Sequence, residues 1–486
     1  MAGWSEKASV VLILVVLGIC CYRASTQSFT IDEAWVYNLF VSKPLSAMAR
    51  HYDACNHVLH TLLMKGARAT LGGSELALRA PSLLAAVLYC VACFRLTQLV
   101  LGGWIGFLCL GLLTLNPMIL DFLVAARGYG LGLALFLWAL YCAIRYSSTG
   151  FGRSWLRWAG VCSGLAIAAN LIMLVPAAAL GCALLILMAR RGFASSWEIV
   201  DVYGGPAIAI AFLFVVIPVL PARPEDFYVG APDLATSVQT LVASFIKGRR
   251  HWPGTSPDLF LRVGSQYLAP IVFLALIAGL VATVPRYLRA GVLSSRINAW
   301  IVLAGTAVFS VVLVLLLHST LGVRYPYGRT GIYLLPLFFI APLYGLKILD
   351  FAGAKWVRLT GSVFAAFLLF VCLRQRDNRY FTEWQYDAGT SHLMKVLRNH
   401  HKNRIQLQPG EKVRFGTHQF LKQTAIWYKE RHRLEWLDDP SSDNLEAGGY
   451  RYYLLTPAEN QLAKKLGLET IAADPVSGEF LSWLKP

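Results

Sequence analysis

Long apolar runs separated by short polar connections fill residues 1–373, and the share of polar residues rises sharply beyond residue 373. A bilayer core about 30 Å thick needs about 20 apolar residues per helix. The runs therefore predict eleven membrane spans, near residues 8–25, 81–100, 103–120, 129–145, 156–171, 172–189, 202–220, 266–284, 299–317, 331–346 and 357–373. This pattern is typical of a polytopic α-helical membrane protein.

Three longer polar segments interrupt or follow the spans: residues 26–80, 221–265 and 374–486. The last segment has a mixed pattern, in which four stretches read as strands and residues 391–400 and 418–430 have helical spacing. The strand-like stretches are KVRFG, RLEWL, RYYLLT and EFLSWL. We therefore expect two domains, a membrane domain over 1–373 and a small α/β domain over 374–486.

Composition and charge support the membrane assignment and orient the chain. The sequence is 56% hydrophobic and 15% charged, and its mean hydropathy is +0.54, outside the range of soluble domains. Residues 1–373 hold 27 Lys and Arg against 13 Asp and Glu, so the positive charge lies with the spans and nucleic acid is not the expected partner. Short basic loops stay cytoplasmic, which predicts a cytoplasmic N terminus and exterior positions for segments 26–80, 221–265 and 374–486.

Two adjacent carboxylates, Asp32 and Glu33, stand in FTIDEAWVYNLF, shortly after the first span. Thr30 and Glu33 have the spacing of a capping box, so Glu33 is either a helix cap or a catalytic carboxylate. The box does not require Asp32, although a carboxylate in the first turn also favours the helix dipole. Asp32 is therefore the stronger candidate for chemistry.

The polar residues that follow allow two interpretations. Asp53, His57 and His60 share one face if their segment is helical, as the polar side of the helix or as ligands of a metal or substrate. Glu75 and Arg79 have i, i+4 spacing, for which a structural salt bridge at the entry of the second span is the favoured interpretation.

Arginine and tyrosine residues gather at the predicted exterior ends of later spans. Arg127 and Tyr129 follow Asp121 in DFLVAARGYGLGLAL, and three further candidates stand in VRYPYGRTGIYLLP: Arg324, Tyr327 and Arg329. Arginine holds phosphate through paired hydrogen bonds, although an arginine at a span end also binds lipid headgroups. The clustering of these residues favours a phosphorylated substrate at the membrane surface.

The order of these motifs resembles that of the GT-C membrane glycosyltransferases. The resemblance rests on an exterior Asp-Glu pair, then NHVLHTLL, LGGSELALRAPSLLAAVLY and NPMILDFLVAARGYGLGLAL, and it covers residues 1 to about 150 with a thinner continuation through GRTGIYLLPLF. The most similar group is the bacterial set related to protein O-mannosyltransferases and lipid A aminoarabinose transferases. The chain departs from the family pattern at Val58, Ala126 and Gly128.

The resemblance implies a multi-pass protein of the bacterial inner membrane that uses a polyprenyl-phosphate-linked sugar as donor. It places Asp32 at the reaction centre and assigns Arg127 and Arg329 to the donor phosphate. Some relatives bind a divalent cation, for which His57 and Glu75 are the candidates, so metal dependence stays open. The acceptor is a glycolipid, a polysaccharide or a protein.

From these residues we predict sugar transfer at the periplasmic face with inversion at the anomeric carbon. Asp32 takes the acceptor proton, two arginines stabilise the leaving phosphate, and Glu33 and His57 assist. Two alternatives stay open. One is a non-covalent transporter or flippase of a lipid-linked sugar, and the other is a membrane anchor that presents the C-terminal domain to a partner.

Overall fold

The computed structural model of the chain describes residues 2–50, 52–189, 193–223, 226, 229–243, 262–289, 295–351, 355–404 and 411–485. Residues 224, 225, 227, 228 and 244–261 of the predicted second loop, 221–265, therefore lie outside the described residues.

A helix lies at each of the eleven predicted spans, and the prediction of a polytopic helical membrane protein is confirmed. Seven helical segments among the described residues are long and apolar enough to cross a membrane, while α6, α17 and α18 contain shorter apolar stretches. The helices of the bundle are α1 (Ala2–Thr26), α5 (Glu75–Val100), α6 (Gly103–Thr114), α8 (Gly128–Ser148), α9 (Arg153–Ala169), α10 (Leu174–Ala189), α12 (Gly205–Val219), α15 (Ala269–Arg289), α16 (Ser295–Leu321), α17 (Leu334–Phe351) and α18 (Lys355–Gln375).

The third predicted span, 103–120, is divided into two helices. Helix α6 ends at Thr114, and α7 (Pro117–Phe122) begins after Asn116, whose side chain accepts a hydrogen bond from Ile119 N at 3.2 Å. Asparagine at the N-cap and proline at the first helical position start a new helix. The hydrophobic pattern alone does not reveal this break.

Small residues let the helices of the bundle approach closely, as is common in membrane proteins. Helix α9 packs between α8 and α12. At Gly160 an added Cβ would lie 2.3 Å from the carbonyl oxygen of Tyr203, in the π-helical turn that precedes α12. This contact brings α12 against the bundle without an intervening side chain.

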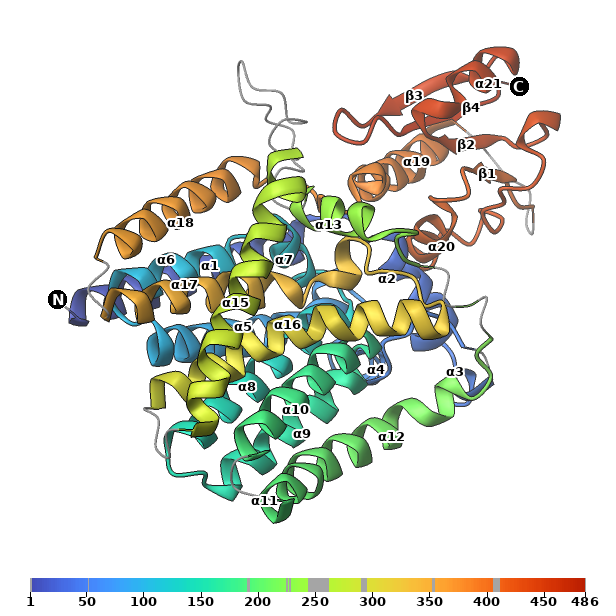
Figure 1. The fold of residues 1–486 in the computed structure, drawn as a ribbon. Coiled ribbons are helices and arrows are strands. Elements are labelled where there is room, and N and C mark those ends of the chain that lie inside the picture. Colours follow the sequence, from blue (N-terminus) through green and yellow to red (C-terminus); the bar gives the residue numbers. More distant parts are fainter. Residues whose placement is uncertain are drawn as a thin grey trace.

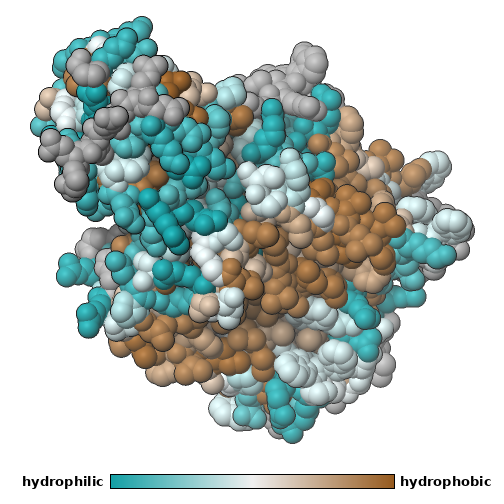
Figure 2. Space-filling model, turned by 180° about the vertical axis from the view of Figure 1, so that it is seen from behind, coloured by the Kyte–Doolittle hydropathy of each residue, from teal (hydrophilic) through white to brown (hydrophobic). Residues whose placement is uncertain are grey.

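The two ends of the bundle differ. In Figure 1 the N terminus lies at one end and the C-terminal sheet lies at the other, beside α2 (Ile31–Val36), α13 (Leu234–Ala243) and α20 (Lys422–Arg431). Figure 2 shows a broad hydrophobic band across the bundle and a mostly hydrophilic surface over the C-terminal part. The first polar segment, which holds α2, α3 (Ala47–Arg50) and α4 (Val58–Leu71), lies at the end that carries the sheet.

The C-terminal part is a small α/β unit, as predicted. Its sheet has the order β1-β2-β4-β3, with β1 parallel to β2 and the other two pairs antiparallel. Its elements are α19 (Thr390–Arg404), β1 (Phe415–Thr417), α20, β2 (Tyr452–Leu455), α21 (Asn460–Lys465), β3 (Glu469–Ala473) and β4 (Phe480–Trp483).

One strand prediction for this unit is wrong, and one strand was not predicted. RLEWL makes only an isolated bridge between Leu437 and Val413 rather than a strand. The sequence pattern also missed β3, because this edge strand is exposed or half-buried along its length and lacks the alternation of a half-buried strand.

The C-terminal unit shares a hydrophobic core with the first polar segment. Phe29 stacks on Trp427 with 4.3 Å between ring centroids, and Tyr37 contacts the edge of the same ring. The predicted boundary at residue 374 therefore separates sequence patterns, while the core crosses it.

A buried ion pair ties α1 to this junction. The Arg23 guanidinium bonds to the Asp121 carboxylate of α7, and both residues are about 1% exposed. Arg23 also donates to the carbonyl of Tyr380, and the backbone N–H of Glu383 donates to Asp121, each at 3.2 Å. One pair thus joins the first span, α7 and the segment that enters the C-terminal unit.

We predict that Asp121→Ala strongly destabilises the protein, because it leaves the Arg23 charge buried without its partner, at a cost of about 3–5 kcal/mol. The melting temperature in detergent should fall far more than for the control Asp201→Ala, which changes an exposed carboxylate. The double variant Arg23→Met/Asp121→Leu should recover most of the loss. Equal melting temperatures for Asp121→Ala and the control would contradict a role of the pair in stability.

Candidate active site

The two adjacent carboxylates at the start of α2 have opposite surroundings. Glu33 is fully buried, and Arg79 of α5 donates to both of its oxygens at 2.8 and 2.7 Å. Ala126 N donates to the same carboxylate at 2.6 Å, and the predicted capping box with Thr30 is present. Glu33 therefore ties α2 to α5 and to the segment before α8, and its catalytic role stays a prediction that this position does not support.

The predicted salt bridge between Glu75 and Arg79 is wrong. Arg79 reaches Glu33 instead, and it also donates to the carbonyl of Ser28. Glu75 lies 3.8 Å from the guanidinium of Arg431. The i, i+4 rule fails here because the end of α1 and the start of α2 supply acceptors directly at the Arg79 side chain.

Asp32 lies where α2 meets two other arginines. Its Oδ2 atom accepts a hydrogen bond from Arg329 Nη1 at 2.7 Å and lies 3.7 Å from Arg127 Nη2. Arg127 also donates to the backbone carbonyls of Asp32 and Cys55 at 3.3 and 3.0 Å. The Asp32 side chain keeps 15% exposure and Arg329 keeps 20%, whereas Arg127 is buried.

The electrostatics keep Asp32 ionised. Burial works against the charged form, but the charges of Arg329 and Arg127, with hydrogen bonds from Trp384 and Arg329, hold the pKa of Asp32 below its ordinary value. The arginines thus preserve a carboxylate in a site that largely excludes water.

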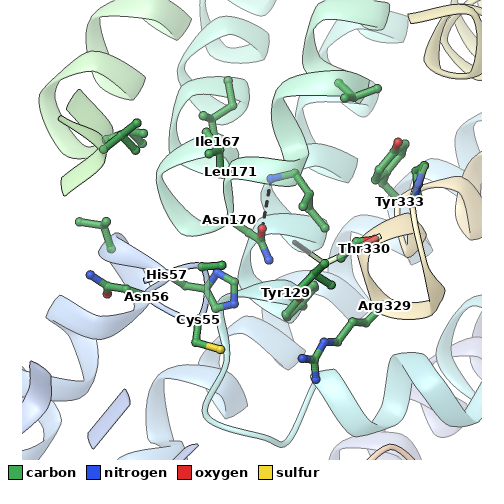
Figure 3. Close-up of a pocket in the computed structure, with 18 of the residues that line it drawn as sticks. Cys55, Asn56, His57, Tyr129, Ile167, Asn170, Leu171, Arg329, Thr330 and Tyr333 are labelled. Carbon is green, nitrogen blue, oxygen red and sulfur yellow. Dashed lines mark hydrogen bonds between the residues drawn. The ribbon is translucent and has the colours of Figure 1, made fainter. Parts of the chain in front are cut away.

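A cavity of about 260 Å³ lies against the two arginines; we call it the polar cavity. Its wall includes His57, Arg127, Tyr129, Asn170 and Arg329, most of which Figure 3 shows gathered around one space. Three buried nitrogens of this wall lack a hydrogen-bond partner among the described residues: His57 Nε2, Arg127 Nε and Asn170 Nδ2. Buried polar atoms are rarely left unpaired, so they mark a place for a polar ligand.

His57 is held in the wall by a close approach of the backbone. A Cβ at Gly128, the first residue of α8, would lie 2.0 Å from the carbonyl oxygen of Ala169 and 2.5 Å from His57 Cβ. Glycine is therefore required where α8, α9 and the start of α4 meet. This departure from the family pattern has a packing reason.

The predicted helical face of Asp53, His57 and His60 is wrong, because α4 begins only at Val58. Asp53 accepts from the Trp35 indole at 2.8 Å, and His60 Nε2 bonds to the Ser82 hydroxyl at 2.9 Å. Of the three, Asp53 and His57 line the polar cavity.

The structure brings most of the other candidates to the polar cavity. Tyr129 and Arg324 line it together with the two central arginines, whereas Tyr327 is 47% exposed and is not part of the wall. Among the described residues, no group of three or more His, Cys, Asp or Glu could hold a metal ion. Asp32 itself lies behind the arginines and does not line the cavity.

An apolar groove adjoins the polar cavity. It holds about 750 Å³ between α9, α10 and α12, and its wall shares Ile167, Leu171, Val215 and Val219 with the cavity. Large apolar side chains of its wall are exposed, among them Ile208 at 69% and Phe212 at 64%. The polar cavity is therefore continuous with a surface that suits hydrocarbon.

Sequence reasoning missed two contributors. Asn170 stands in AIAANLIML, where a single amide within an apolar run is a usable signal because burying an unpaired amide costs free energy. Trp384 lies in the C-terminal segment, is 1% exposed and has its ring 5.8 Å from the Arg329 guanidinium. No local pattern links this tryptophan to Asp32, since the contact depends on the tertiary fold.

Comparison with known proteins gives likenesses of fold. No family model matches the chain, and no curated protein matches it. ArnT from Cupriavidus metallidurans bound to undecaprenyl phosphate is similar with a TM-score of 0.46 and 14% identity, over 99% of this chain and 98% of that chain. The Archaeoglobus fulgidus oligosaccharyltransferase in complex with Zn and sulfate is similar with a TM-score of 0.47 and 11% identity, over 97% of this chain and 72% of that chain. Both likenesses are of fold alone, at low sequence identity.

Two buried histidines, His57 at the N-cap of α4 and His60 within α4, provide a test of this geometry. Burial, with the charge of Arg127, lowers the pKa of His60 to about 3, and burial together with Arg127, His60 and Arg329 holds the pKa of His57 well below its ordinary value. In the unfolded chain both side chains bind protons near pH 6.5. The unfolded state therefore binds more protons below that pH, and stability must fall as the pH is lowered.

We predict that the melting temperature in detergent falls between pH 6.5 and 5, and that His60→Gln lessens this fall. Glutamine keeps a donor to Ser82 but does not titrate, which removes a contribution of up to about 1.4 kcal/mol per pH unit. The comparison is the melting temperature of the variant minus that of the wild type at each pH. A difference that stays constant from pH 7.5 to 5 would show that His60 is not buried as a neutral side chain.

Proposed function

We propose that this protein transfers a sugar from a polyprenyl-phosphate-linked donor to an acceptor hydroxyl. One observation carries the proposal: the Asp32 carboxylate forms ion pairs with Arg329 and Arg127, and these arginines line a polar cavity that adjoins an apolar groove. The arrangement provides a holder for phosphate and a path for a lipid chain, with a carboxylate next to the cavity wall.

Arg127 and Arg329 are the proposed holders of the donor phosphate. Arg127 is fixed by two backbone carbonyls, and its Nε atom has no partner among the described residues. Arg329 uses Nη1 for Asp32, which leaves further N–H groups of a guanidinium that has five. In the reaction these donors stabilise the negative charge that develops on the leaving phosphate.

Asp32 is the proposed general base. The acceptor hydroxyl loses its proton to the carboxylate while its oxygen bonds to the anomeric carbon, and the bond from that carbon to the phosphate oxygen breaks. The products are the glycosylated acceptor and a polyprenyl phosphate. A single displacement of this kind inverts the anomeric carbon, and it needs the base on the side opposite the leaving group.

The lipid part of the donor is proposed to lie in the apolar groove. A polyprenyl chain is branched hydrocarbon, and burial of such a chain is favourable by roughly 25 cal/mol per Å². The exposed apolar residues of α12 would allow the lipid to enter sideways from the bilayer. We further propose that the site faces the periplasm of a bacterial inner membrane, with the C-terminal unit on the same side and the N terminus in the cytoplasm. The acceptor is a glycolipid, a polysaccharide or a protein.

We predict that Asp32→Asn slows sugar transfer by about 10²–10⁴-fold, since asparagine keeps the shape but cannot take the proton. The assay mixes purified protein with total membrane lipids of the source cell and follows released polyprenyl phosphate and new glycoconjugates by mass spectrometry. Asp439→Asn, which changes an 87% exposed carboxylate of the C-terminal unit, is the matched control.

Wild-type turnover by Asp32→Asn would remove Asp32 from the mechanism. Movement of the lipid-linked sugar between leaflets of a vesicle, without any covalent product, would favour the transporter or flippase alternative instead.

The groove gives a separate prediction. Ala211 lines it and is half-buried, so Ala211→Trp should fill the space and weaken binding of undecaprenyl phosphate by at least about tenfold, because the lipid loses buried area. Leu274→Trp on α15 adds the same side chain at a position that is 62% exposed and away from the groove. Native mass spectrometry of both variants in detergent measures the effect, and equal affinities would place the lipid elsewhere.

A further inference from the structure

The short helix that carries Asp32 cannot hold its own position. Helix α2 has six residues, and isolated helices of this length are unstable in water because nucleation is costly. Its first N–H groups need partners from outside the helix. Thr30 N donates to Glu33 within the capping box, but the amides on either side, of Phe29 and Ile31, depend on other parts of the chain.

The C-terminal unit supplies both of those partners. Ile31 N donates to Asp387 Oδ2 at 2.6 Å, and Phe29 N donates to the Tyr428 hydroxyl oxygen at 2.9 Å. Both acceptor residues are about 1% exposed or less. The backbone immediately before Asp32 is therefore fixed by residues more than 350 positions away in the sequence.

The same unit also reaches the Asp32 side chain. The indole of Trp384 helps to lower the pKa of the Asp32 carboxyl, and its ring lies 5.8 Å from the guanidinium of Arg329, the strongest partner of that carboxylate. Trp384 packs against Phe122 and Phe381, whose ring centroids lie 5.4 and 5.9 Å from its own. The orientation of the indole is thus set by packing.

We propose that the C-terminal unit completes the catalytic centre, with Trp384 and Asp387 as positioning residues for Asp32. Asp387 fixes the backbone of α2, and Trp384 fixes the carboxylate relative to Arg329. This assigns a task to residues 374–486, whose sequence carries no catalytic motif. The inference rests on the proposed function for its kinetic consequences, while the positioning of α2 can be tested without it.

The surroundings of Asp387 make its two substitutions informative. Burial, with the nearby carboxylates of Glu479, Glu33 and Asp32, raises the pKa of Asp387 well above its ordinary value. A neutral acid still accepts the Ile31 N–H through its carbonyl oxygen. Asn in place of Asp keeps that acceptor, whereas Ala removes it and leaves a buried N–H unpaired.

The first experiment compares Trp384→Phe with Trp483→Phe in the full-length protein. Trp483 is also buried in the C-terminal unit, and its indole donates to Glu469 at 2.9 Å, away from Asp32. We expect Trp384→Phe to release polyprenyl phosphate from membrane lipids about tenfold more slowly, the size of effect of a hydrogen bond to a charged group. Its affinity for undecaprenyl phosphate should equal that of the wild type, and Trp483→Phe should match the wild type in both.

The second experiment compares Asp387→Asn with Asp387→Ala by turnover and by amide hydrogen exchange of residues 27–38. Loss of the acceptor in Asp387→Ala should speed exchange in α2 and reduce turnover, and Asp387→Asn should restore most of both. Exchange of the bundle helices α8 and α9 serves as the control for a general loss of folding.

The outcomes separate the two proposals. Full turnover by Trp384→Phe and Asp387→Ala, in preparations where the wild type is active, would overturn the positioning roles and leave the proposed function standing. If the wild type forms no product, the proposed function fails, and amide exchange in α2 alone tests the positioning role of Asp387. Exchange in Asp387→Ala at wild-type rates would overturn that role. Faster exchange confined to α2 would support it.

Discussion

The structure depends on the different surroundings of two neighbouring carboxylates, Glu33 and Asp32. Glu33 is buried with the guanidinium of Arg79, which also bonds to the carbonyls at the end of α1. This interaction fixes where α2 begins and leaves the Asp32 side chain beside Arg127 and Arg329. A buried ion pair of this kind is costly to break. It therefore fixes the position of α2, and with it the position of Asp32 relative to Arg127 and Arg329. Glu33 thus holds α2 against the bundle, and Asp32 is the proposed general base.

The same constraint links the membrane bundle to the C-terminal unit. Asp121, Glu33 and Asp32 contact arginines from α1, α5, the start of α8 and the segment before α17, and segments of the C-terminal unit close over them. The polar cavity is lined by Arg127 and Arg329, and the apolar groove continues from it along α12. The Asp32 carboxylate and its two arginines therefore lie beside a cavity that joins an apolar groove, which is the arrangement that the proposed transfer requires.

Much of the fold and part of the candidate site could be predicted from the sequence, because a bilayer requires long apolar runs and charge is costly within them. The apolar runs predict the helices, and the mixed pattern beyond residue 373 predicts the α/β unit. Polar residues are rare near the spans, so the clustering of Asp32, Arg127 and Arg329 could also be predicted. The i, i+4 spacing of Glu75 and Arg79 predicted the wrong ion pair, because the tertiary fold brings Glu33 to the Arg79 side chain. The role of Trp384 could not be predicted from the sequence, because only the tertiary fold brings this residue to α2.

The proposed transfer requires Arg127 and Arg329 to hold a lipid-linked phosphate beside the apolar groove. An experimental structure of the protein with undecaprenyl phosphate tests it most directly. We expect phosphate oxygens within hydrogen-bond distance of both guanidiniums and isoprene units between α10 and α12. Phosphate density at any other basic surface, with the cavity beside Asp32 left without lipid, would contradict it.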